Sequence, residues 1–395
     1  MDTVPVSPER EQILHRLAEM MNTRHRNPFP ITRELLECFD AAVSDEEARF
    51  LLLLGAKPFA YADIASISRM PADRFGLLFE GLVRKGMIWP PIGGTADLYQ
   101  VAGIMVGWFE VYLSNGQETP EQREFSRRLD RLFKSWGRYN TFPLRSLLNY
   151  RVRHASPQQS IVAVRGTGET SEARRITVDR TVPTAPPKIY PARTVGDLIE
   201  EHGDANNIVA VHCFCRQYHK MVDEPCRFEH PPQSCLAIGP LAGNAVRNGG
   251  GRRLSKQEAR ALIAELQRKG AVHQVFHQDE DVDKPEIAIC NCCWDCCGVF
   301  GSYNRGIMPL NLKSYFEARI VSGTSTCSGC GTCTEHCPVA AISLHDHQPR
   351  IDGHLCIGCG QCEFQCPEDA IELVPHERTV MLPLVKRSEA RIQWQ

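Results

Sequence analysis

The chain has little that would place it in a membrane or give it a large net charge. Its 395 residues carry a formal net charge of −2, which favours binding neither to nucleic acid at large nor to a membrane surface. The longest apolar run, residues 50–54, is far too short to span a bilayer. Residues 1–10 contain no hydrophobic signal segment and no twin-arginine signal. We therefore expect a cytoplasmic protein without a membrane span.

Common catalytic motifs are also missing. The sequence contains no dinucleotide-binding fingerprint, no P-loop, no H-E-x-x-H and no G-x-S-x-G. The isolated C-x3-C-x2-C of radical enzymes that use S-adenosylmethionine is absent as well. These absences disfavour nucleotide-dependent and hydrolytic chemistry, and we assign no catalytic residue.

Cysteine, by contrast, is abundant and concentrated in one part of the chain. There are 18 cysteines, and 17 of them lie between residues 213 and 366. Thiols stay reduced in the cytosol, so such a density indicates metal binding rather than disulfides. Cys38 stands alone in an apolar stretch and is most simply a small buried hydrophobic residue.

The strongest signal is an internal repeat near the C-terminus, with an offset of 29 residues. Both halves read C-x2-C-x2-C-x3-C-P, the first at 327–338 and the second at 356–367. This spacing resembles that of bacterial dicluster ferredoxins, in which three thiolates hold one cube and the fourth reaches the other cube. The resemblance implies two [4Fe–4S] clusters with crossed ligands. Cluster I would take Cys327, Cys330, Cys333 and Cys366, and cluster II would take Cys356, Cys359, Cys362 and Cys337.

Two features of the repeat support iron over zinc or disulfides. Zinc does not need eight thiolates in this repeated spacing. Glycines at positions 329, 331, 358 and 360 would let the backbone approach a cluster and direct N–H groups at its sulfur atoms. A module of this kind transfers single electrons and binds no substrate by itself.

A second cysteine region precedes the repeat. It resembles a group of ferredoxin-domain proteins with a C-x-C-R, C, C and C-N-C-C-x-x-C-C-G pattern, some of which have a further cysteine at the position of Asp295. The resemblance implies further clusters but no particular reaction. The nine candidate ligands are Cys213, Cys215, Cys226, Cys235, Cys290, Cys292, Cys293, Cys296 and Cys297.

The number of centres in this region is left open by the sequence. Adjacent cysteines such as Cys292 and Cys293 project in different directions, which suggests two sets of thiols facing two centres. We expect at least one further [4Fe–4S] cluster, and one or two in all, with only a subset of the nine cysteines as ligands. The ligands are expected to include Cys226, Cys235 and members of the 290–297 group, joined by Cys213 or Cys215. A structural zinc, or one zinc plus free thiols, is the alternative.

The remaining sequence predicts an α+β multidomain protein. Residues 31–112 show a winged-helix-like rhythm of helices near 33–42, 44–55, 62–69 and 71–85, followed by short strands at 87–90 and 98–104. The predicted divisions are a helical winged-helix-like domain at 1–122, a basic aromatic helical segment at 123–154, a linker at 155–194, a Cys-rich α+β iron–sulfur domain at 195–320, a dicluster ferredoxin domain at 321–376 and a C-terminal tail at 377–395.

Charge distribution separates two functional hypotheses. Residues 1–122 carry 11 basic and 17 acidic side chains, an unfavourable balance for gripping DNA. The leading hypothesis is therefore an electron-transfer subunit of a cytoplasmic redox complex, with a redox protein as partner. The rival is a redox-sensing regulator that binds DNA through its N-terminal domain or the basic segment. A third hypothesis is an enzyme with an open iron site in the middle domain.

Overall fold

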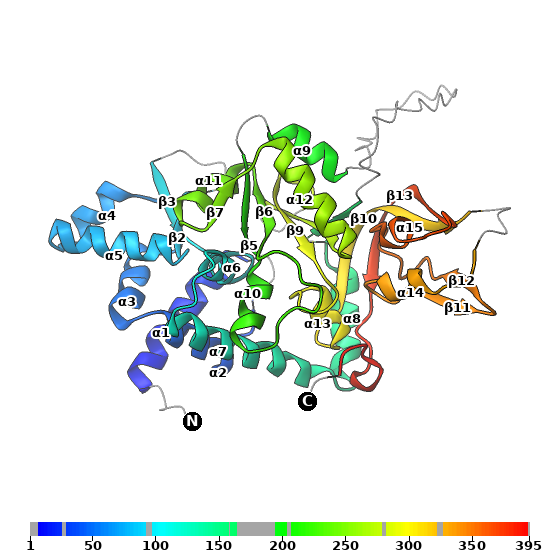
Figure 1. The fold of residues 1–395 in the computed structure, drawn as a ribbon. Coiled ribbons are helices and arrows are strands. Elements are labelled where there is room, and N and C mark those ends of the chain that lie inside the picture. Colours follow the sequence, from blue (N-terminus) through cyan, green and yellow to red (C-terminus); the bar gives the residue numbers. More distant parts are fainter. Residues whose placement is uncertain are drawn as a thin grey trace, which may run out of the picture.

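The computed structural model combines a helical N-terminal region, a large mixed sheet and a small C-terminal module at one end of that sheet (Figure 1). It describes residues 7–25, 29–91, 97–157, 159–163, 194–203, 207–278, 282–321 and 327–393. No helix in these ranges is both long and apolar enough to cross a bilayer.

The N-terminal region begins with five helices, four of which the sequence predicts. They are α1 (Pro8–Asn22), α2 (Arg33–Ala42), α3 (Asp45–Leu54), α4 (Tyr61–Ser68) and α5 (Ala72–Arg84). A capping box starts α3, because the Ser44 hydroxyl accepts from the Glu47 N–H while the Glu47 carboxylate accepts from the Ser44 N–H. Gly55, with a φ of 73°, ends that helix. The four predicted helices between residues 33 and 85 are thus confirmed within a residue or two of their expected bounds.

A three-stranded sheet of short strands accompanies these helices. It has the order β1 (Phe59–Ala60), β3 (Leu98–Val101), β2 (Ile88–Trp89), and both neighbouring pairs are antiparallel. The two strands predicted after α5 are confirmed, although both are shorter than expected. Residues 92–96, between these two strands, lie outside the described residues. The winged-helix resemblance of this unit stays a prediction.

Three further helices complete the region: α6 (Phe109–Ser114), α7 (Pro120–Trp136) and α8 (Leu144–His154). Helix α6 continues a π-helical turn at Ile104–Trp108, and a 3-10 turn at Gly137–Tyr139 lies between α7 and α8. Helix α7 packs against α2, and its Phe125 contacts the ring of Trp108. Helix α10 (Phe214–Met221), which belongs to the Cys-rich region, packs against α6 and α7. Phe214 and Tyr218 extend the same hydrophobic core. The Cys-rich region is therefore anchored to the N-terminal helices.

The middle of the molecule is an eight-stranded sheet with the order β13-β10-β4-β8-β9-β6-β5-β7. Neighbouring strands in its described part run antiparallel, except for β4 and β10, which are parallel. The strands are β4 (Gln159–Val162), β5 (Ile208–His212), β6 (Gln233–Ile238), β7 (Gly251–Arg253), β8 (Val272–His277), β9 (Glu286–Cys292), β10 (Leu310–Ile320) and β13 (Ile371–Leu382).

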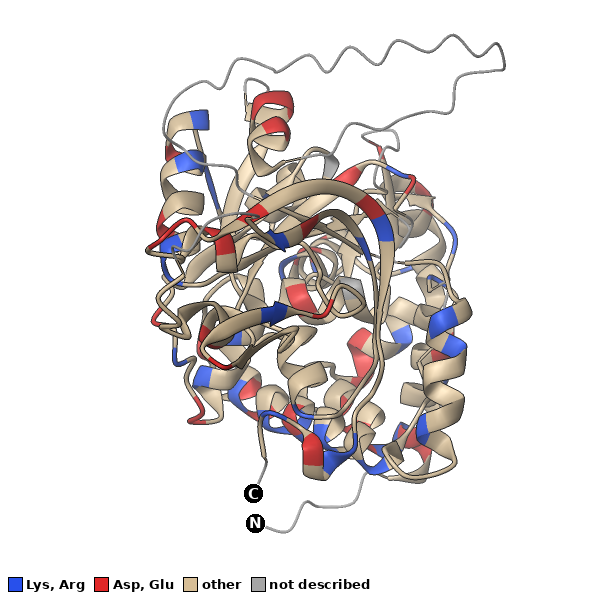
Figure 2. Cartoon of the chain, turned by 90° about the vertical axis from the view of Figure 1, so that its right-hand side faces the viewer, with Lys and Arg blue, Asp and Glu red and all other residues tan. Residues whose placement is uncertain are grey.

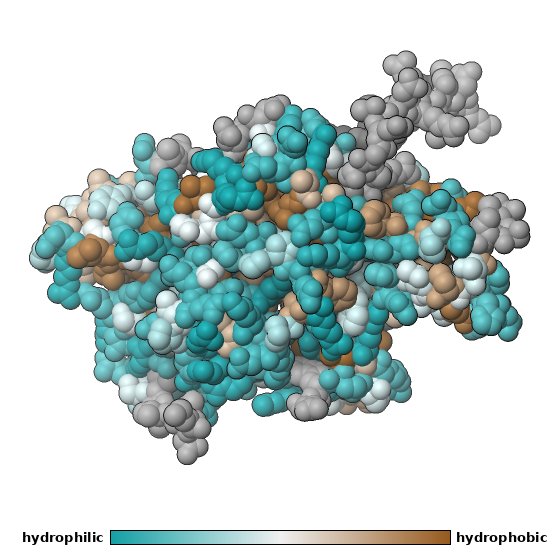
Figure 3. Space-filling view, viewed as in Figure 1, coloured by the Kyte–Doolittle hydropathy of each residue, from teal (hydrophilic) through white to brown (hydrophobic). Residues whose placement is uncertain are grey.

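Helices cover this sheet and close its core. Helices α9 (Val195–Gly203) and α12 (Lys256–Arg268) pack against each other, and both contribute side chains to the sheet's core. A capping box of Ser255 and Glu258 starts α12. The short helix α11 (Pro240–Arg247) packs near β5, β6 and β7. The short helix α13 (Phe300–Asn304) lies beside the cysteine loop at 293–298. Figure 3 shows a mostly hydrophilic outer face, with hydrophobic patches such as the one over the α4–α5 end.

In the sequence, the C-terminal module lies between β10 and β13, two strands that pair with each other in the sheet. It contains α14 (Thr332–His336), the hairpin of β11 (Ile342–His345) and β12 (Gln348–Ile351), and α15 (Gln361–Phe364). Its two ends continue into β10 and β13, which pair from Leu310 and Leu382 to Ile320 and Ile371. The module thus stands at the end of a long antiparallel ladder (Figure 1).

Two strands of this sheet can be compared with the predicted divisions of the chain. Strand β4 lies within the segment expected to be a linker, and β13 runs across the boundary expected at residue 376. Gln159–Val162 is too short and too polar at its start to be distinguished from a connector by sequence. It becomes a strand because β8 and β10 provide partners on both sides.

The helical core gives a stability prediction with a control on the same helix. Leu82 of α5 is fully buried, whereas Leu77 of α5 is 73% exposed. Leu82→Ala should lower the free energy of unfolding by about 2–5 kcal/mol because it leaves a cavity. Leu77→Ala should change it by no more than about 0.5 kcal/mol. Urea unfolding of both variants, followed by circular dichroism, checks this, and equal losses would contradict the packing of α5.

Candidate metal centres

The C-terminal module forms two tight loops, each followed by a short helix. In the first loop Gly329 and Gly331 have φ angles of 69° and 82°, and in the second Gly358 and Gly360 have φ angles of 64° and 79°. These left-handed conformations favour glycine because a Cβ would clash with the backbone. The repeat in the sequence is therefore a repeat in backbone geometry, with α14 and α15 in equivalent places.

Each loop borders a cavity that also receives one cysteine from the other half of the repeat. One cavity is lined by Cys327, Cys330, Cys333 and Cys366. The other is lined by Cys337, Cys356, Cys359 and Cys362. The structure thus brings together the two sets of four thiols that the ferredoxin resemblance implies for cluster I and cluster II. We call these cavities the cluster I site and the cluster II site.

Backbone N–H groups point at the thiols of these sites. The Ala341 N–H donates to Cys337 Sγ at 3.1 Å, and the Ala370 N–H donates to Cys366 Sγ at 3.3 Å. Alanines 341 and 370 are equivalent positions of the 29-residue repeat. Such bonds stabilise thiolate and tune a bound cluster, so the donors fit an iron–sulfur cube at both sites.

The two sites differ in depth. All four thiols of the cluster II site are buried, and burial raises the pKa of the Cys359 and Cys362 thiols. In the cluster I site Cys330 is exposed, and its hydrogen bonds with Thr332 lower its pKa. Of the two sites, the cluster I site is the one nearer to solvent.

In the Cys-rich region the structure divides the nine cysteines into two groups. The larger group is a ring in which each thiol is a hydrogen-bond partner of two others. We call it the six-thiol ring. Its order is Cys213, Cys215, Cys297, Cys292, Cys290, Cys235 and back to Cys213. Strand β9, strand β6, the start of α10 and the loop after β9 supply these thiols, so the ring exists only when these elements pack together.

The smaller group is the triad of Cys226, Cys293 and Cys296, whose sulfur atoms all lie within 4.8 Å of one another. Cys293 Sγ lies 3.5 Å from Cys226 Sγ and 3.2 Å from Cys296 Sγ. The pKa of Cys226 is lowered to about 3 by its hydrogen bonds with Cys293 and Cys296. The triad could hold a metal. For a cube, whose thiolates stand roughly 6 Å apart at different corners, the triad would have to widen. Cys226, on a loop and partly exposed, is the member best placed to move.

Arg216 carries a charge that interacts with both groups. It is 7% exposed, and its charge interacts with Cys213 and Cys235 of the six-thiol ring and with Cys293 and Cys296 of the triad. Burial lowers its pKa, but the thiolates outweigh burial and raise it. Its guanidinium bonds the Ser234 hydroxyl, the His230 ring and, at 2.7 Å, the Asn291 carbonyl. A fixed buried cation therefore faces both sets of thiols.

Further donors surround the ring. The N–H groups of Gly298 and Val299 donate to Cys215 Sγ at 3.2 Å and to Cys297 Sγ at 3.3 Å. The Gln274 amide donates to Cys292 Sγ at 3.8 Å. Sequence reasoning missed Arg216 and Gln274. The first has a signal in the C-x-C-R pattern, whereas Gln274 has none, because only the register of β8 on β9 places it beside the cysteines.

Asp295 is the neighbour of Cys296 of the triad in the chain. Its carboxylate accepts from the Arg227 N–H at 3.3 Å and lies 3.6 Å from the guanidinium groups of Arg227 and Arg305. These residues line a cavity of about 400 Å³, which also borders Cys297. The carboxylate is thus held by two arginines at a cavity wall.

Comparison with known proteins agrees with the C-terminal geometry. A family model of the 4Fe-4S dicluster domain matches residues 326–371. No curated protein and no solved structure matches the chain. This is an iron–sulfur protein: a dicluster domain binds two [4Fe–4S] clusters, and its presence implies a role in electron transfer. The match begins after the last cysteine of the Cys-rich region, so it leaves the six-thiol ring and the triad unassigned.

The loop glycines give a prediction about the cluster II site. A Cβ on Gly358 would lie 1.9 Å from the Phe316 carbonyl oxygen, so Gly358→Ala should push the 356–362 loop away from β10. The variant should lose about four irons per chain. Gly331→Ala is the matched control, because its φ is also left-handed while its nearest neighbour, Leu344 Cδ1, is 3.5 Å away. Iron analysis after anaerobic purification checks both, and equal losses would refute the steric argument.

Proposed function

We propose that this protein is an electron-transfer subunit of a cytoplasmic redox complex. Single electrons would pass through clusters I and II and through one or two upstream centres in the Cys-rich region. Proposed ligands are the eight thiols of the cluster I and cluster II sites, and a subset of the nine upstream cysteines. The catalytic step, in this proposal, belongs to a partner protein.

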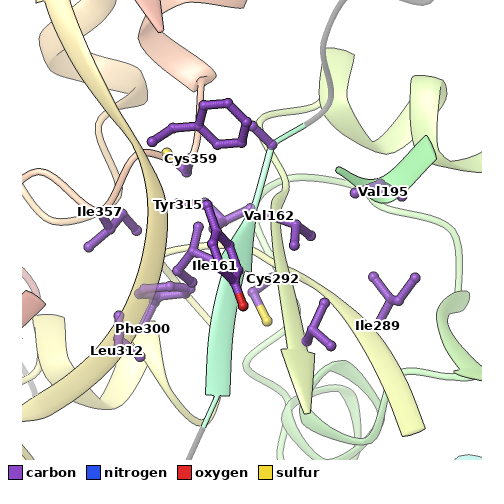
Figure 4. Close-up of a cluster of buried hydrophobic side chains, with 14 of the residues drawn as sticks. Ile161, Val162, Val195, Ile289, Cys292, Phe300, Leu312, Tyr315, Ile357 and Cys359 are labelled. Atoms are coloured by element: carbon purple, nitrogen blue, oxygen red, sulfur yellow. The ribbon is translucent and has the colours of Figure 1, made fainter. Parts of the chain in front are cut away.

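One observation carries the proposal: the thiols of both regions belong to the same hydrophobic core. Cys292 and Cys297 of the six-thiol ring share this core with Cys337, Cys356, Cys359 and Cys362 of the cluster II site. Figure 4 shows Cys292 and Cys359 in one group of buried side chains, with Ile161 and Tyr315 drawn between them. Electron tunnelling falls steeply with distance and with loose packing, so a close-packed core between two centres suits electron transfer.

Burial suggests the order of the centres. The cluster II site is buried and faces the shared core, whereas the cluster I site opens at the surface through Cys330. The Asn304 amide, from α13 in the Cys-rich region, donates to the Pro338 carbonyl at 2.9 Å, next to Cys337. The order that follows is upstream centre, cluster II, cluster I and then the partner.

The surface around the cluster I site indicates the partner's charge. Residues 325–376 carry one arginine and seven acidic residues, and Glu335, Asp346, Glu368 and Asp369 are exposed. A basic partner surface would be attracted to this module. The basic segment of the chain itself is a weaker candidate, because the cations of α7 are already paired with acids outside the module. These ion pairs are Arg123–Glu118, Arg127–Glu124, Arg128–Glu37, Arg131–Glu37 and Lys134–Asp130.

The same ion pairs bear on the DNA-binding alternative. Figure 2 shows basic and acidic residues interleaved along the edge near the two termini, without a field of one sign. Arg145, Arg151 and Arg153 of α8 make no ion pair with the described residues. The regulator hypothesis can be tested with a variant in which all three arginines are changed to glutamate. In a gel-shift assay, DNA from upstream of the protein's own gene would be the probe. Binding by the native protein that is lost in this variant would favour the regulator.

Salt and charge give the first test of the electron-transfer proposal. Reduced protein should pass electrons to a basic c-type cytochrome at a rate that falls as ionic strength rises, because salt screens the acidic module. Changing Glu335, Asp346, Glu368 and Asp369 to their amides should slow transfer at low salt. The control removes three exposed charges, Glu9, Glu11 and Glu19 on α1, which lies away from the C-terminal module (Figure 1). Equal slowing by both sets would contradict docking at the cluster I site. Iron analysis tests the proposal itself, and about four or fewer irons per chain would refute it.

Arg216 gives a second test. Arg216→Gln removes a buried positive charge beside the upstream thiols, so it should lower the reduction potential of the upstream centre or centres. Arg216→Lys keeps the charge and should shift the potential less. A redox titration followed by EPR measures both variants, with clusters I and II as internal references. An unchanged upstream potential in Arg216→Gln would show that no redox centre lies beside this side chain.

A further inference from the structure

The three thiols of the triad are grouped more tightly than those of the other sites. Cys293 Sγ lies 3.5 Å from Cys226 Sγ and 3.2 Å from Cys296 Sγ, and all three sulfur atoms lie within 4.8 Å of one another. Among the described residues, no other three cysteine, histidine or acidic side chains bring their ligand atoms this close together. The thiols that line the cluster I and cluster II sites are therefore more widely spaced than the triad.

This spacing distinguishes a single metal ion from a cluster. A zinc ion with tetrahedral thiolates at about 2.3 Å places its sulfur atoms about 3.8 Å apart. Thiolates at different corners of a cube stand roughly 6 Å apart. The triad is close to the first value and well short of the second, so it suits one mononuclear ion without widening.

The pair of Cys293 and Cys296 has the local geometry of a metal-binding turn. The two residues form a C-x2-C sequence, a spacing found in structural zinc sites. The Cys296 N–H donates to Cys293 Sγ at 3.2 Å. This hydrogen bond closes the turn and stabilises the thiolate that a metal requires.

Neighbouring contacts bring the third thiol to this turn. Cys226 lies on the loop between α10 and β6. The next residue, Arg227, donates its N–H to the carboxylate of Asp295 at 3.3 Å. The ring of Phe228 packs edge-on against that of Trp294, with centroids 5.5 Å apart. The loop of Cys226 is therefore held against the two residues inside the C-x2-C turn.

Charge and ligand type favour zinc at this place. Thiolates are soft ligands, and zinc binds them more tightly than ferrous iron does. Three thiolates around a divalent cation leave a single net negative charge, which the buried guanidinium of Arg216 offsets through its interaction with Cys293 and Cys296. Among the described residues no histidine or carboxylate joins the three thiols within 4.8 Å. Cys226 is partly exposed, so water can reach the remaining position.

We propose that Cys226, Cys293 and Cys296 bind one zinc ion, with water as the fourth ligand, and that this ion joins the loop after α10 to the loop after β9. This inference does not rest on the proposed function but narrows it. Zinc does not change its oxidation state, so the upstream electron-transfer centre is confined to the six-thiol ring. The ion also helps to position the ring, because Cys292 and Cys297 adjoin the triad cysteines in the chain.

Metal analysis of single variants tests the site. The native chain, purified anaerobically from zinc-containing medium, should hold about one zinc. Cys226→Ala should lose that zinc and keep its iron, because Cys226 belongs neither to the ring nor to the cluster I and II sites. Cys235→Ala is the matched control, since it removes a ring thiol on β6 and should keep its zinc.

The outcomes separate this inference from the electron-transfer proposal. Unchanged zinc in Cys226→Ala, a loss of iron in its place, or equal loss of zinc from both variants would overturn the zinc site and leave electron transfer standing. The electron-transfer proposal fails separately, if the native chain holds about four or fewer irons.

X-ray absorption at the zinc edge identifies the ligands in the native protein, because iron does not contribute at that energy. Three sulfur atoms at about 2.3 Å and one oxygen atom at about 2.0 Å are expected. A shell without sulfur would assign the zinc to another part of the surface. A shell of four sulfur atoms would add a further thiol, and either result would overturn the three-thiol site.

Amide hydrogen exchange tests whether the ion joins the two loops. Removal of zinc by EDTA should speed exchange in residues 222–232 of the native protein about tenfold, because the loop then opens more often. Cys226→Ala should show the faster exchange already and should not respond to EDTA. Equal exchange with and without zinc in the native protein would show that no ion holds this loop.

Discussion

The pairing of β10 with β13 is the constraint on which the arrangement of the thiols depends. The dicluster module lies between these strands in the sequence, and their ladder joins both of its ends to the central sheet. A module on a flexible linker would sample many distances from the Cys-rich region. The ladder fixes one position, and the buried side chains of β10, among them Leu312 and Phe316, then join the thiols of both regions in a single core.

Charge is the second constraint, because thiolates collected in a buried place repel one another. Backbone N–H groups around the sulfur atoms and the buried guanidinium of Arg216 offset this repulsion. A buried cation is costly unless it is paired and hydrogen bonded. Arg216 meets this condition through Ser234, His230 and Asn291, so its position is fixed and its effect falls on the six-thiol ring and the triad alike.

Local features of the fold could be predicted well from the sequence. The capping box at Ser44 starts a helix where expected, because a cap is a contact between residues three apart. Strand β4 could not be predicted, because its partners β8 and β10 lie more than a hundred residues away in the chain. The same holds for the Cys-rich region. The sequence identifies its nine thiols as candidate ligands, but it does not predict that they form one group of six and one of three.

By itself, the sequence determined the chemistry of the C-terminal module. A repeat of C-x2-C-x2-C-x3-C-P with glycines between the cysteines specifies tight loops and left-handed turns, because each loop is built from residues close in the chain. The two crossed sets of four thiols are what the resemblance to dicluster ferredoxins implies. Only the tertiary structure decided that Cys226 joins Cys293 and Cys296, and that Cys213 meets Cys235. These contacts depend on how α10, β6 and β9 pack, and long-range packing is not encoded in any short spacing of residues.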